Sequence, residues 1–370
     1  MAEQQSSVES MAVIKSFYRG RRVFITGHTG FKGSWLCEVL LNLGAEAGGY
    51  ALPPEKNTPN LFDILSLSDR ITANFTGDVR DPEGLKRAVK SFMPEIVIHM
   101  AAQPLVLESY RNPAYTYEVN VMGTVNILEA VRECKSVKSF VNVTTDKVYL
   151  NREWVYGYRE NERLCGYDPY SNSKSCSELV TYSYRNSFFS DSDSPAISTA
   201  RSGNVIGGGD FSANRIIPDC MRSVLNGEDI FLRNPYSVRP YQHVLECLNG
   251  YLLLAMKQYE DKSAYEGSYN FGPDEDSCIN TQKLVDMFRK NYYGGGGHSL
   301  KAVSQNNTSV KQHEANILKL DCSKSRAVLG WRPEWDIERA VIEAVNWLRI
   351  YAAHGDLRSY MDDQIMGRRW

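Results

Sequence analysis

Two groups of side chains in the middle of the chain have the types and spacing needed for acid–base chemistry. Thr145, Asp146 and Lys147 are consecutive and follow an apolar run, and Tyr170 and Lys174 come later. Residues four apart share one face of a helix, so Tyr170 and Lys174 are expected side by side. An ammonium close to a phenol lowers its pKa because it favours the phenolate. Tyr170 is therefore predicted to take the proton of an alcohol while the carbon loses a hydride.

The pair Asp146 and Lys147 exceeds what the oxidation of an alcohol requires. Eliminating water from the resulting ketone also needs a base at the α-carbon and an acid at the leaving hydroxyl, and an acid–base pair could supply both. The alternative interpretation is a solvent-facing ion pair at the end of a strand, which would contribute little. The sequence thus favours an elimination coupled to hydride transfer.

A glycine-rich loop near the N-terminus has the spacing of a phosphate cradle. Its glycines fall as G-x-x-G-x-x-G between the apolar run 22–26 and the helical pattern 32–43. Such glycines allow a tight turn, a close backbone approach to a pyrophosphate and close packing of helix on strand. The N–H groups at the helix start then hold the anion. We predict dinucleotide binding, rather than a merely structural turn, by Gly27, His28, Thr29, Gly30, Phe31, Lys32 and Gly33.

Further cofactor contacts are expected beyond the carboxyl ends of the other strands, where ligands bind in such sheets. The alternative for each is an ordinary loop residue. The candidates at these strand ends are Asp78, Val79, Ala101, Ala102 and Gln103. Asn120, Tyr170 and Lys174 are further predicted cofactor contacts.

The residues alone do not choose between NAD and NADP. The usual carboxylate that grips the ribose 2′-hydroxyl is missing, because the second strand ends in Gly49-Tyr50-Ala51 and Glu55 lies beyond two prolines. Arg70 or Lys56 could instead face a 2′-phosphate.

Short apolar runs alternate with amphipathic helical patterns through the first half, which predicts a doubly wound parallel α/β sheet of the Rossmann type. After about Gly203 the chain becomes richer in loops, and we expect a smaller, mixed α/β C-terminal domain that binds substrate, with a soft and discontinuous boundary. The expected units are a loose extension over 1–20, a dinucleotide-binding domain over 21–202 and a substrate domain over 203–370. The predicted strands are 22–26, 47–51, 71–75, 95–99, 139–143 and 196–201, and the predicted helices are 32–43, 121–133, 170–184 and one that opens at Asp81-Pro82.

Composition is that of an ordinary globular protein, with 42% hydrophobic residues and a formal net charge of -2. This balance does not suggest a nucleic-acid or membrane partner. No stretch approaches the roughly 18 apolar residues that span a bilayer. The eight cysteines are scattered without a C-x-x-C pair, so neither a metal site nor a disulfide framework is expected. We predict a cytoplasmic protein with free thiols.

Several longer motifs resemble the extended short-chain dehydrogenase/reductases and, within them, the CDP-glucose 4,6-dehydratases. The resemblance runs from about residue 17 to about residue 347. It rests on GHTGFKGSWL (27–36), GDVRD (77–81), HMAAQPLV (99–106), NVMGTVNILEAV (120–131), TTDKVY (144–149), GYRENE (157–162), GYDPYSNSK (166–174), RSGNVIGGGDF (201–211) and RNPYSVRPYQHV (233–244).

This resemblance implies a reaction and a role for each catalytic residue. Tyr170 would take the C4 hydroxyl proton of CDP-glucose while hydride passes to NAD, and Lys174 would tune Tyr170 and bind the nicotinamide ribose. Thr145 would hydrogen-bond the reacting hydroxyl. Lys147 would be the base at C5 and Asp146 the acid at the C6 hydroxyl. Hydride would return to C6, giving a CDP-4-keto-6-deoxy sugar.

The resemblance also implies a substrate-binding set and a homodimer formed through the helices 121–133 and 170–184. Leu107 and Cys165 depart from the family pattern beside the cofactor and the substrate loop. The implied substrate-binding residues are Gln103, Ser202, Asn204, Arg215, Arg239 and His243.

Two other functions are compatible with the fold. A nucleotide-sugar epimerase would need no base at C5, so Asp146 and Lys147 argue against it. A non-catalytic dinucleotide-binding protein would not need Tyr170, Lys174 and Thr145.

Overall fold

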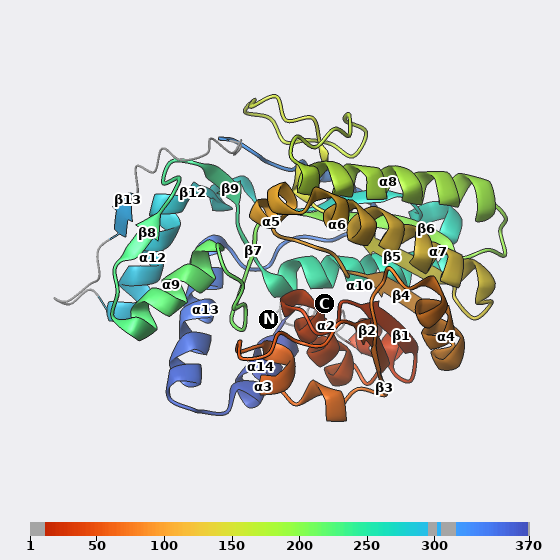
Figure 1. Ribbon diagram of the computed structural model, residues 1–370, viewed down its shortest axis with the longest axis horizontal. Helices are drawn as coiled ribbons and strands as arrows, with labels where there is room; N and C mark the ends of the chain where they lie inside the picture. Colours follow the sequence, from red (N-terminus) through yellow and green to blue (C-terminus); the bar gives the residue numbers. More distant parts are fainter. Residues whose placement is uncertain (1–11, 295–301, 305–315, 369–370) are drawn as a thin grey trace.

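The computed structural model describes residues 12–294, 302–304 and 316–368, and its centre is a seven-stranded parallel sheet (Figure 1). The strand order is β11-β6-β5-β4-β1-β2-β3. This confirms the predicted doubly wound α/β fold. The strands are β1 (Arg22–Thr26), β2 (Glu46–Ala51), β3 (Ala73–Thr76), β4 (Ile96–His99), β5 (Ser139–Val143), β6 (Ala196–Ser202) and β11 (Ser268–Phe271).

Helices cover both faces of this sheet because successive side chains of each strand point to opposite sides. In β1, Val23 and Ile25 join the core formed with α2 (Phe31–Asn42) and α10 (Val244–Glu260). Phe24 joins the core formed with α4 (Pro82–Phe92) and α7 (Gly123–Glu133). The helices of the sheet are α2 (Phe31–Asn42), α4 (Pro82–Phe92), α7 (Gly123–Glu133), α8 (Pro169–Phe188) and α10 (Val244–Glu260).

The predicted helix starts are largely confirmed. The side chain of Asp81 caps α4 by accepting from the N–H of Gly84, and Pro82 occupies the first turn, as the Asp-Pro pair predicts. The helix predicted over 121–133 begins at Gly123 instead, and residues 121 and 122 belong to a π-helical turn, Glu118–Met122. That wide turn contains Asn120, one of the predicted cofactor residues.

The seventh strand, β11, lies in the half of the chain that was expected to bind substrate. It pairs with β6 in register from Ser268↔Thr199 to Phe271↔Ser202. Helix α10 from the same half packs against the sheet. Residues 244–271 therefore belong to the sheet. The division of the chain near residue 203 stays a prediction.

A separate hydrophobic core lies in the C-terminal half. It is built from α9 (Ile216–Asn226), α12 (Thr281–Tyr293) and α13 (Ile337–Ala352), with Ile217, Phe288 and Val341 fully or almost fully buried. Short strands surround these helices: β7 (Val205–Ile206), β8 (Ile230–Leu232), β9 (Val238–Pro240), β10 (Gln242–His243), β12 (Cys278–Asn280) and β13 (Ala302–Ser304). Figure 1 shows this group beside the sheet. The predicted smaller, mixed α/β part is confirmed.

Short helices and turns join these elements. They are α3 (Leu61–Ile64), α5 (Val106–Arg111), α6 (Pro113–Tyr117), α11 (Lys262–Tyr265) and α14 (Leu357–Met366), with the single turns Leu67–Asp69, Asp146–Val148, Glu275–Ser277 and Ser325–Leu329. Within the described ranges, no helix combines the length and apolar character that crossing a bilayer would require. All eight cysteines are free thiols.

The expected loose N-terminal extension differs from the structure in its second half. Residues 1–11 lie outside the described residues, but 12–18 are helical. The Tyr18 hydroxyl donates to the carbonyl of Leu252 at 2.7 Å, and both Ile14 and Tyr18 are buried. The apolar face of this helix therefore packs on the sheet's helices, which residue polarity alone did not indicate.

A buried ion pair fastens α8 to the sheet. The Glu178 carboxylate accepts two hydrogen bonds from the Arg201 guanidinium, at 2.8 and 2.9 Å, and both side chains are 2% exposed. Thr144 and Thr199 also donate to this carboxylate. Burial raises the pKa of Glu178, but the Arg201 charge and these hydrogen bonds outweigh it and lower the pKa overall.

Replacing Glu178 by Gln should lower the free energy of unfolding by about 3–5 kcal/mol, because Arg201 would keep a buried charge without its counter-ion. Chemical denaturation measures this. Lys90→Ala is the matched control, since Lys90 forms an exposed ion pair with Glu133 and should cost less than about 1 kcal/mol. Equal losses in the two variants would contradict the prediction.

Candidate active site

The glycine loop has the geometry of a phosphate cradle. Gly27 adopts a left-handed φ of 78°, and its N–H donates to the Tyr50 carbonyl of β2 at 2.9 Å. Gly30 is the N-cap of α2 and offers no side chain to cap it. The first N–H groups of α2 are therefore free of a side-chain partner and suit an anion.

The three glycines differ in what surrounds them. A Cβ on Gly33 would lie 2.1 Å from the Gly27 carbonyl oxygen, and one on Gly27 would lie 2.8 Å from the Ala101 nitrogen. A Cβ on Gly30 would meet only the Gly27 oxygen, at 3.4 Å. The packing of the protein itself therefore requires glycine at positions 33 and 27, whereas the space beside Gly30 is open. Pyrophosphate binding there stays a prediction.

The side chains of the next two loop residues hold the cradle in place. His28 is buried, and its Nε2 lies 2.8 Å from the Asn74 side-chain oxygen of β3. Burial lowers the pKa of His28, although hydrogen bonds oppose this, so its ring is neutral. The Thr29 hydroxyl donates to the Leu52 carbonyl at 3.0 Å. The His28 and Thr29 side chains thus fix the loop to neighbouring segments, and neither bonds to the backbone N–H groups at the start of α2.

The end of β2 contains no carboxylate, as the sequence indicates. Arg70, which was considered for a 2′-phosphate, forms two hydrogen bonds of 2.6 Å to the two oxygens of Glu38. Its guanidinium is therefore engaged within the protein. Lys56 lies exposed.

Asp78 and Val79 follow β3 as predicted. Burial raises the pKa of Asp78, but hydrogen bonds from the Arg80 side chain and N–H outweigh it and lower the pKa. Val79 is buried against Gly123, where an added Cβ would lie 2.8 Å from its Cγ2. Asp78 is thus a partly exposed anion, and Val79 packs under the start of α7.

The loop after β4 is braced by two amides that were predicted to bind ligands. Asn120 accepts from the Gln103 N–H at 2.8 Å and donates to the Gln103 carbonyl and to Ser173 of α8. The Gln103 amide bonds to Thr116 and to the backbone of Leu105. Both amides are buried. Their described contacts support the loop 101–105, and binding by these side chains stays a prediction. Ala101 and Ala102 lie half-buried at the loop's start.

Thr145, Asp146 and Lys147 form one connected group after β5. The Thr145 hydroxyl donates to Asp146 Oδ1 at 2.9 Å, and Lys147 Nζ donates to the same oxygen at 3.0 Å. Lys147 Nζ also lies 3.4 Å from the Asn204 side-chain oxygen. Asp146 is fully buried, and its Oδ2 has no hydrogen-bond partner. Burying a carboxylate oxygen without a hydrogen-bond partner costs free energy of folding. Asp146 Oδ2 is therefore a candidate to bond with a ligand.

Tyr170 lies beside this group, but its pKa differs from the sequence-based expectation. Burial raises it to about 12, against the hydrogen bond with Thr145 and the charge of Arg215, which lower it. The Lys174 ammonium donates to the Val143 carbonyl at 3.3 Å. Burial and the Lys32 charge lower the Lys174 pKa to about 8. The expected lowering of the phenol's pKa by Lys174 is therefore not found.

A second cationic group lies at the end of β6. Lys32 Nζ donates to the Ser202 hydroxyl at 3.0 Å and lies 3.5 Å from the Tyr251 hydroxyl of α10. Arg215 pairs with Asp210 at 3.1 Å, and its charge lowers the pKa values of both Tyr170 and Lys32. The charges of Arg215 and Lys32 therefore act on the predicted catalytic residues, and Ser202 is bonded to Lys32.

Two predicted substrate residues have other surroundings. His243 is completely buried, with its ring 4.9 Å from that of Trp335 and 5.7 Å from that of Trp35. Burial lowers its pKa well below the ordinary range. Arg239 of β9 is buried and donates to the carbonyls of Val238 and Asn316. Substrate binding by His243 and Arg239 stays a prediction.

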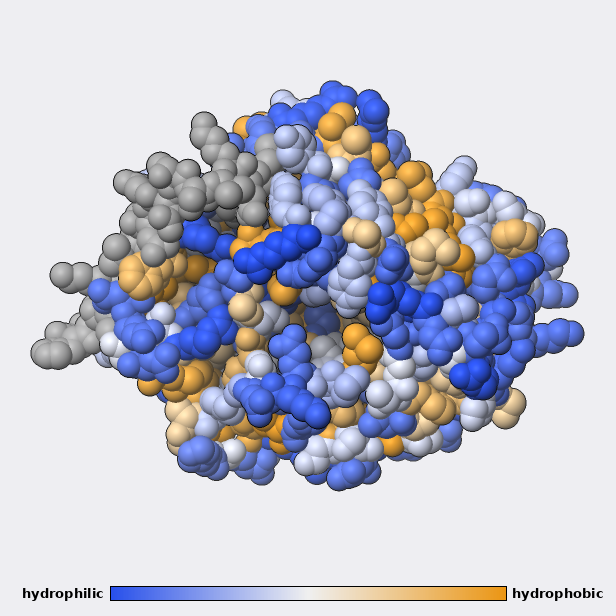
Figure 2. Space-filling view, in the orientation of Figure 1, coloured by the Kyte–Doolittle hydropathy of each residue, from blue (hydrophilic) through white to orange (hydrophobic). Residues whose placement is uncertain are grey.

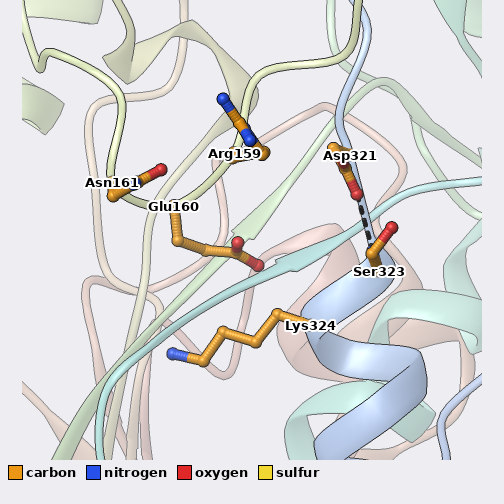
Figure 3. A pocket seen from close by; sticks show the side chains of 6 residues that line it. All are labelled: Arg159, Glu160, Asn161, Asp321, Ser323 and Lys324. Carbon is orange, nitrogen blue, oxygen red and sulfur yellow. Dashed lines mark hydrogen bonds between the residues drawn. The ribbon is translucent and has the colours of Figure 1, made fainter.

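The face drawn in Figure 2 is hollowed near its middle, where Figure 1 has the start of α2 and of α10. Another cavity, of about 260 Å³, lies between the loop after β5 and the segment 321–324 (Figure 3). There Glu160 accepts from the Asn270 N–H at 2.9 Å and so satisfies the edge of β11. The Tyr170 group contributes no lining to that cavity.

Two residues of the site were not predicted from the sequence. Tyr251 shares a 2.6 Å hydrogen bond with Ser202, and Glu178 anchors α8 one turn after Lys174. The i, i+4 spacing of Lys174 and Glu178 could have signalled the second. Tyr251 stands in an apolar helix, so no local pattern marks it.

The chain is similar to known proteins over most of its length. The sequence matches the family model for GDP-mannose 4,6 dehydratase over residues 24–344. The chain belongs to this family. It is 46% identical over 93% of its length to the CDP-glucose 4,6-dehydratase of Salmonella typhimurium, of which it covers 94%. The GDP-mannose 4,6-dehydratase of Yersinia enterocolitica is 26% identical over 88% of the chain and 93% of that protein. The resemblance seen in the motifs is thereby confirmed.

Solved structures support the same fold. The dTDP-glucose 4,6-dehydratase of Bacillus anthracis in complex with NAD has a TM-score of 0.74 at 20% identity, covering 92% of this chain and 100% of that one. The Thermus thermophilus UDP-glucose 4-epimerase in complex with NAD has a TM-score of 0.72 at 25% identity, covering 89% and 99%. Both dehydratases and epimerases therefore share this architecture, so the choice between them rests on side chains.

The contrast between the glycines gives a direct test of the cradle. Gly30→Ala should fold normally but weaken NAD binding at least about tenfold, because its methyl group would occupy the anion's space. Gly33→Ala should destabilise the fold as well, since its Cβ would overlap the Gly27 carbonyl. Calorimetric titration with NAD and thermal unfolding separate the two effects. Unchanged NAD affinity in Gly30→Ala would remove the loop from the binding site.

Proposed function

We propose that the protein converts CDP-D-glucose to CDP-4-keto-6-deoxy-D-glucose by moving a hydride from C4 to C6 through bound NAD. The observation that carries this proposal is the connected group Thr145-Asp146-Lys147 beside Tyr170, with a buried Asp146 oxygen left without a partner. An alcohol dehydrogenase needs only the tyrosine. The extra acid–base pair suits an elimination.

NAD supplies the hydride acceptor for C4 and the hydride donor for C6, so the reaction needs no external oxidant. The cradle at Gly27–Gly33 would hold its pyrophosphate, and Lys174 its nicotinamide ribose. NAD rather than NADP is favoured because Arg70 is already bonded to Glu38. The NAD complexes of structural relatives agree with this choice.

In the first step Tyr170 takes the proton of the C4 hydroxyl while C4 loses its hydride. Thr145 lies between Tyr170 and Asp146, with its hydroxyl bonded to Asp146. It can therefore orient the reacting hydroxyl toward the phenol. The resulting C4 ketone makes the proton at C5 acidic, which prepares the elimination.

In the second step Lys147 removes the C5 proton and Asp146 protonates the leaving C6 hydroxyl. The two groups are 3.0 Å apart, within hydrogen-bond distance for direct proton transfer. Movement of one proton from the ammonium to the carboxylate changes the ion pair into a neutral base and a neutral acid. Water then leaves. The hydride would return to C6 while the Lys147 ammonium gives its proton back to C5, and the proton taken by Tyr170 can replace the one lost by Asp146 through Thr145, which is bonded to both.

The identity of the sugar nucleotide rests on the relatives. The Salmonella typhimurium relative at 46% identity is named a CDP-glucose 4,6-dehydratase. The alternatives are another NDP-hexose as substrate, or an epimerase acting through the same tyrosine. An epimerase would have no use for the pair Asp146–Lys147.

We further propose that the protein is a cytoplasmic homodimer joined through α7 and α8. Met122, Leu179 and Tyr182 are each at least half exposed, and Figure 2 shows apolar side chains gathered over α6 and α8. A second copy would cover them. The eight free thiols suit a reducing compartment. Sedimentation equilibrium would test the dimer, and Leu179→Glu should favour the monomer.

Incubation with CDP-glucose tests the proposed reaction directly. The 4-keto product should appear through its absorbance in alkali, whereas an epimerase would give a C4 epimer and a binding protein neither.

The variant Tyr170→Phe tests the base. It should lower turnover by at least about a hundredfold, because phenylalanine cannot take the C4 hydroxyl proton, and it should retain bound NAD. Normal turnover in that variant would exclude Tyr170 as the base.

Lys147→Ala separates elimination from oxidation. The variant should still oxidise C4, seen as NADH absorbance, but should release water slowly because no base faces C5. With substrate deuterated at C5, the label should be retained. Rapid loss of deuterium to solvent in Lys147→Ala would show that another group removes the C5 proton.

A further inference from the structure

The Lys32 side chain points away from the backbone of the glycine loop and reaches the residues at the end of β6. This side chain runs from the first turn of α2 to the end of β6, where it donates to Ser202 at 3.0 Å. Ser202 in turn bonds to Tyr251 at 2.6 Å, and both hydroxyl-bearing residues are buried. The hydroxyl groups of Ser202 and Tyr251 thus hold the Lys32 ammonium in place.

Among the described residues, none forms a direct ion pair with Lys32. In the portion of the chain that the structure covers, no carboxylate oxygen forms an ion pair with Lys32 or with Lys174. The charge of Asp146 raises the pKa of Lys32, and that of Glu178 raises the pKa of Lys174. Each of these carboxylates already forms an ion pair with another cation, Asp146 with Lys147 and Glu178 with Arg201. Two ammonium groups without a direct ion pair therefore lie in one site, and the Lys32 charge disfavours that of Lys174.

Such an arrangement costs stability and needs a functional reason. An ammonium that reached for a phosphate would be expected to point into open space. The Lys32 ammonium instead lies against buried hydroxyls, which suits a source of field better than a ligand contact. Lys174 feels this field, because the Lys32 charge lowers its pKa.

We propose that Lys32 raises the hydride affinity of the bound dinucleotide by placing a fixed positive charge close to the nicotinamide end of the site. This inference rests on the proposed function. Oxidation at C4 takes a hydride, with two electrons, from carbon and a proton from its hydroxyl. The proton goes to Tyr170, and the hydride makes the positively charged nicotinamide ring neutral. A neighbouring cation destabilises the charged ring and not the neutral one, so it favours uptake of the hydride.

The test compares the affinities of the protein for NAD and NADH without any turnover. Calorimetric titration of the dinucleotide-depleted protein gives both dissociation constants. In Lys32→Met and Lys32→Gln, NAD should gain affinity relative to NADH by about tenfold. Lys32→Gln retains a donor for Ser202, which guards against misfolding of the first variant. Lys32→Arg keeps the charge and should restore the wild-type ratio.

Lys135→Met is the matched control. It removes the same charge from an exposed position before β5, at the opposite edge of the sheet, and should leave the ratio unchanged. A ratio that stays constant in Lys32→Met and Lys32→Gln overturns the inference, as does an equal loss of both affinities, which would indicate a phosphate contact. If the wild-type protein binds neither dinucleotide, the proposed function itself fails.

Discussion

Helix α8 can occupy only one position along its axis because the Glu178 carboxylate is buried and must be fully satisfied. Its hydrogen bonds come from Thr144 after β5 and from Thr199 and Arg201 in β6. A shift of α8 by one residue would leave a buried charge without partners, at a cost of several kcal/mol. Along α8, Lys174 lies about one turn before Glu178, and Tyr170 lies about two turns before Glu178. The ion pair thus sets where both catalytic groups stand over the sheet.

The parallel sheet supplies the other half of the arrangement. All its strands end at the same edge, so the turns after β1, β5 and β6 meet although they lie far apart in the sequence. Gly27, Thr145 and Ser202 each occupy such a position. The Lys32 side chain connects the first of these turns to the last. Positive charge from separate segments therefore accumulates at one edge, where an anionic cofactor and an anionic substrate would both bind.

Local patterns predicted the six strands that alternate with helices, and the capping of α4 by Asp81. They did not predict β11, whose place depends on distant contacts. Its Asn270 side chain bonds to the Tyr149 hydroxyl and to the Tyr158 and Asp321 carbonyls. No short window of sequence contains that information.

The same limit applies to the site. The spacing of Thr145, Asp146 and Lys147 predicted a connected group, because consecutive residues after a strand must lie together. Helical spacing placed Tyr170 and Lys174 on one face but could not show that Lys174 bonds to the Val143 carbonyl. Nor could it show that Asn120 and Gln103 bond to each other. Side chains that brace loops and side chains that bind ligands have the same chemistry, and only coordinates separate them.

The raised pKa of Tyr170 bears on the order of events at C4. Burial raises the pKa of Tyr170 to about 12, so the phenol keeps its proton at neutral pH unless positive charge lies close to it. The positively charged nicotinamide ring of bound NAD would supply such a charge, and the Tyr170 phenolate that it favours could then take the C4 hydroxyl proton. Arg215 stabilises the phenolate, and Lys32, which lies within reach of the Arg215 field, favours hydride uptake. A single patch of cations therefore promotes both halves of the C4 oxidation, which couples the loss of the proton to the loss of the hydride.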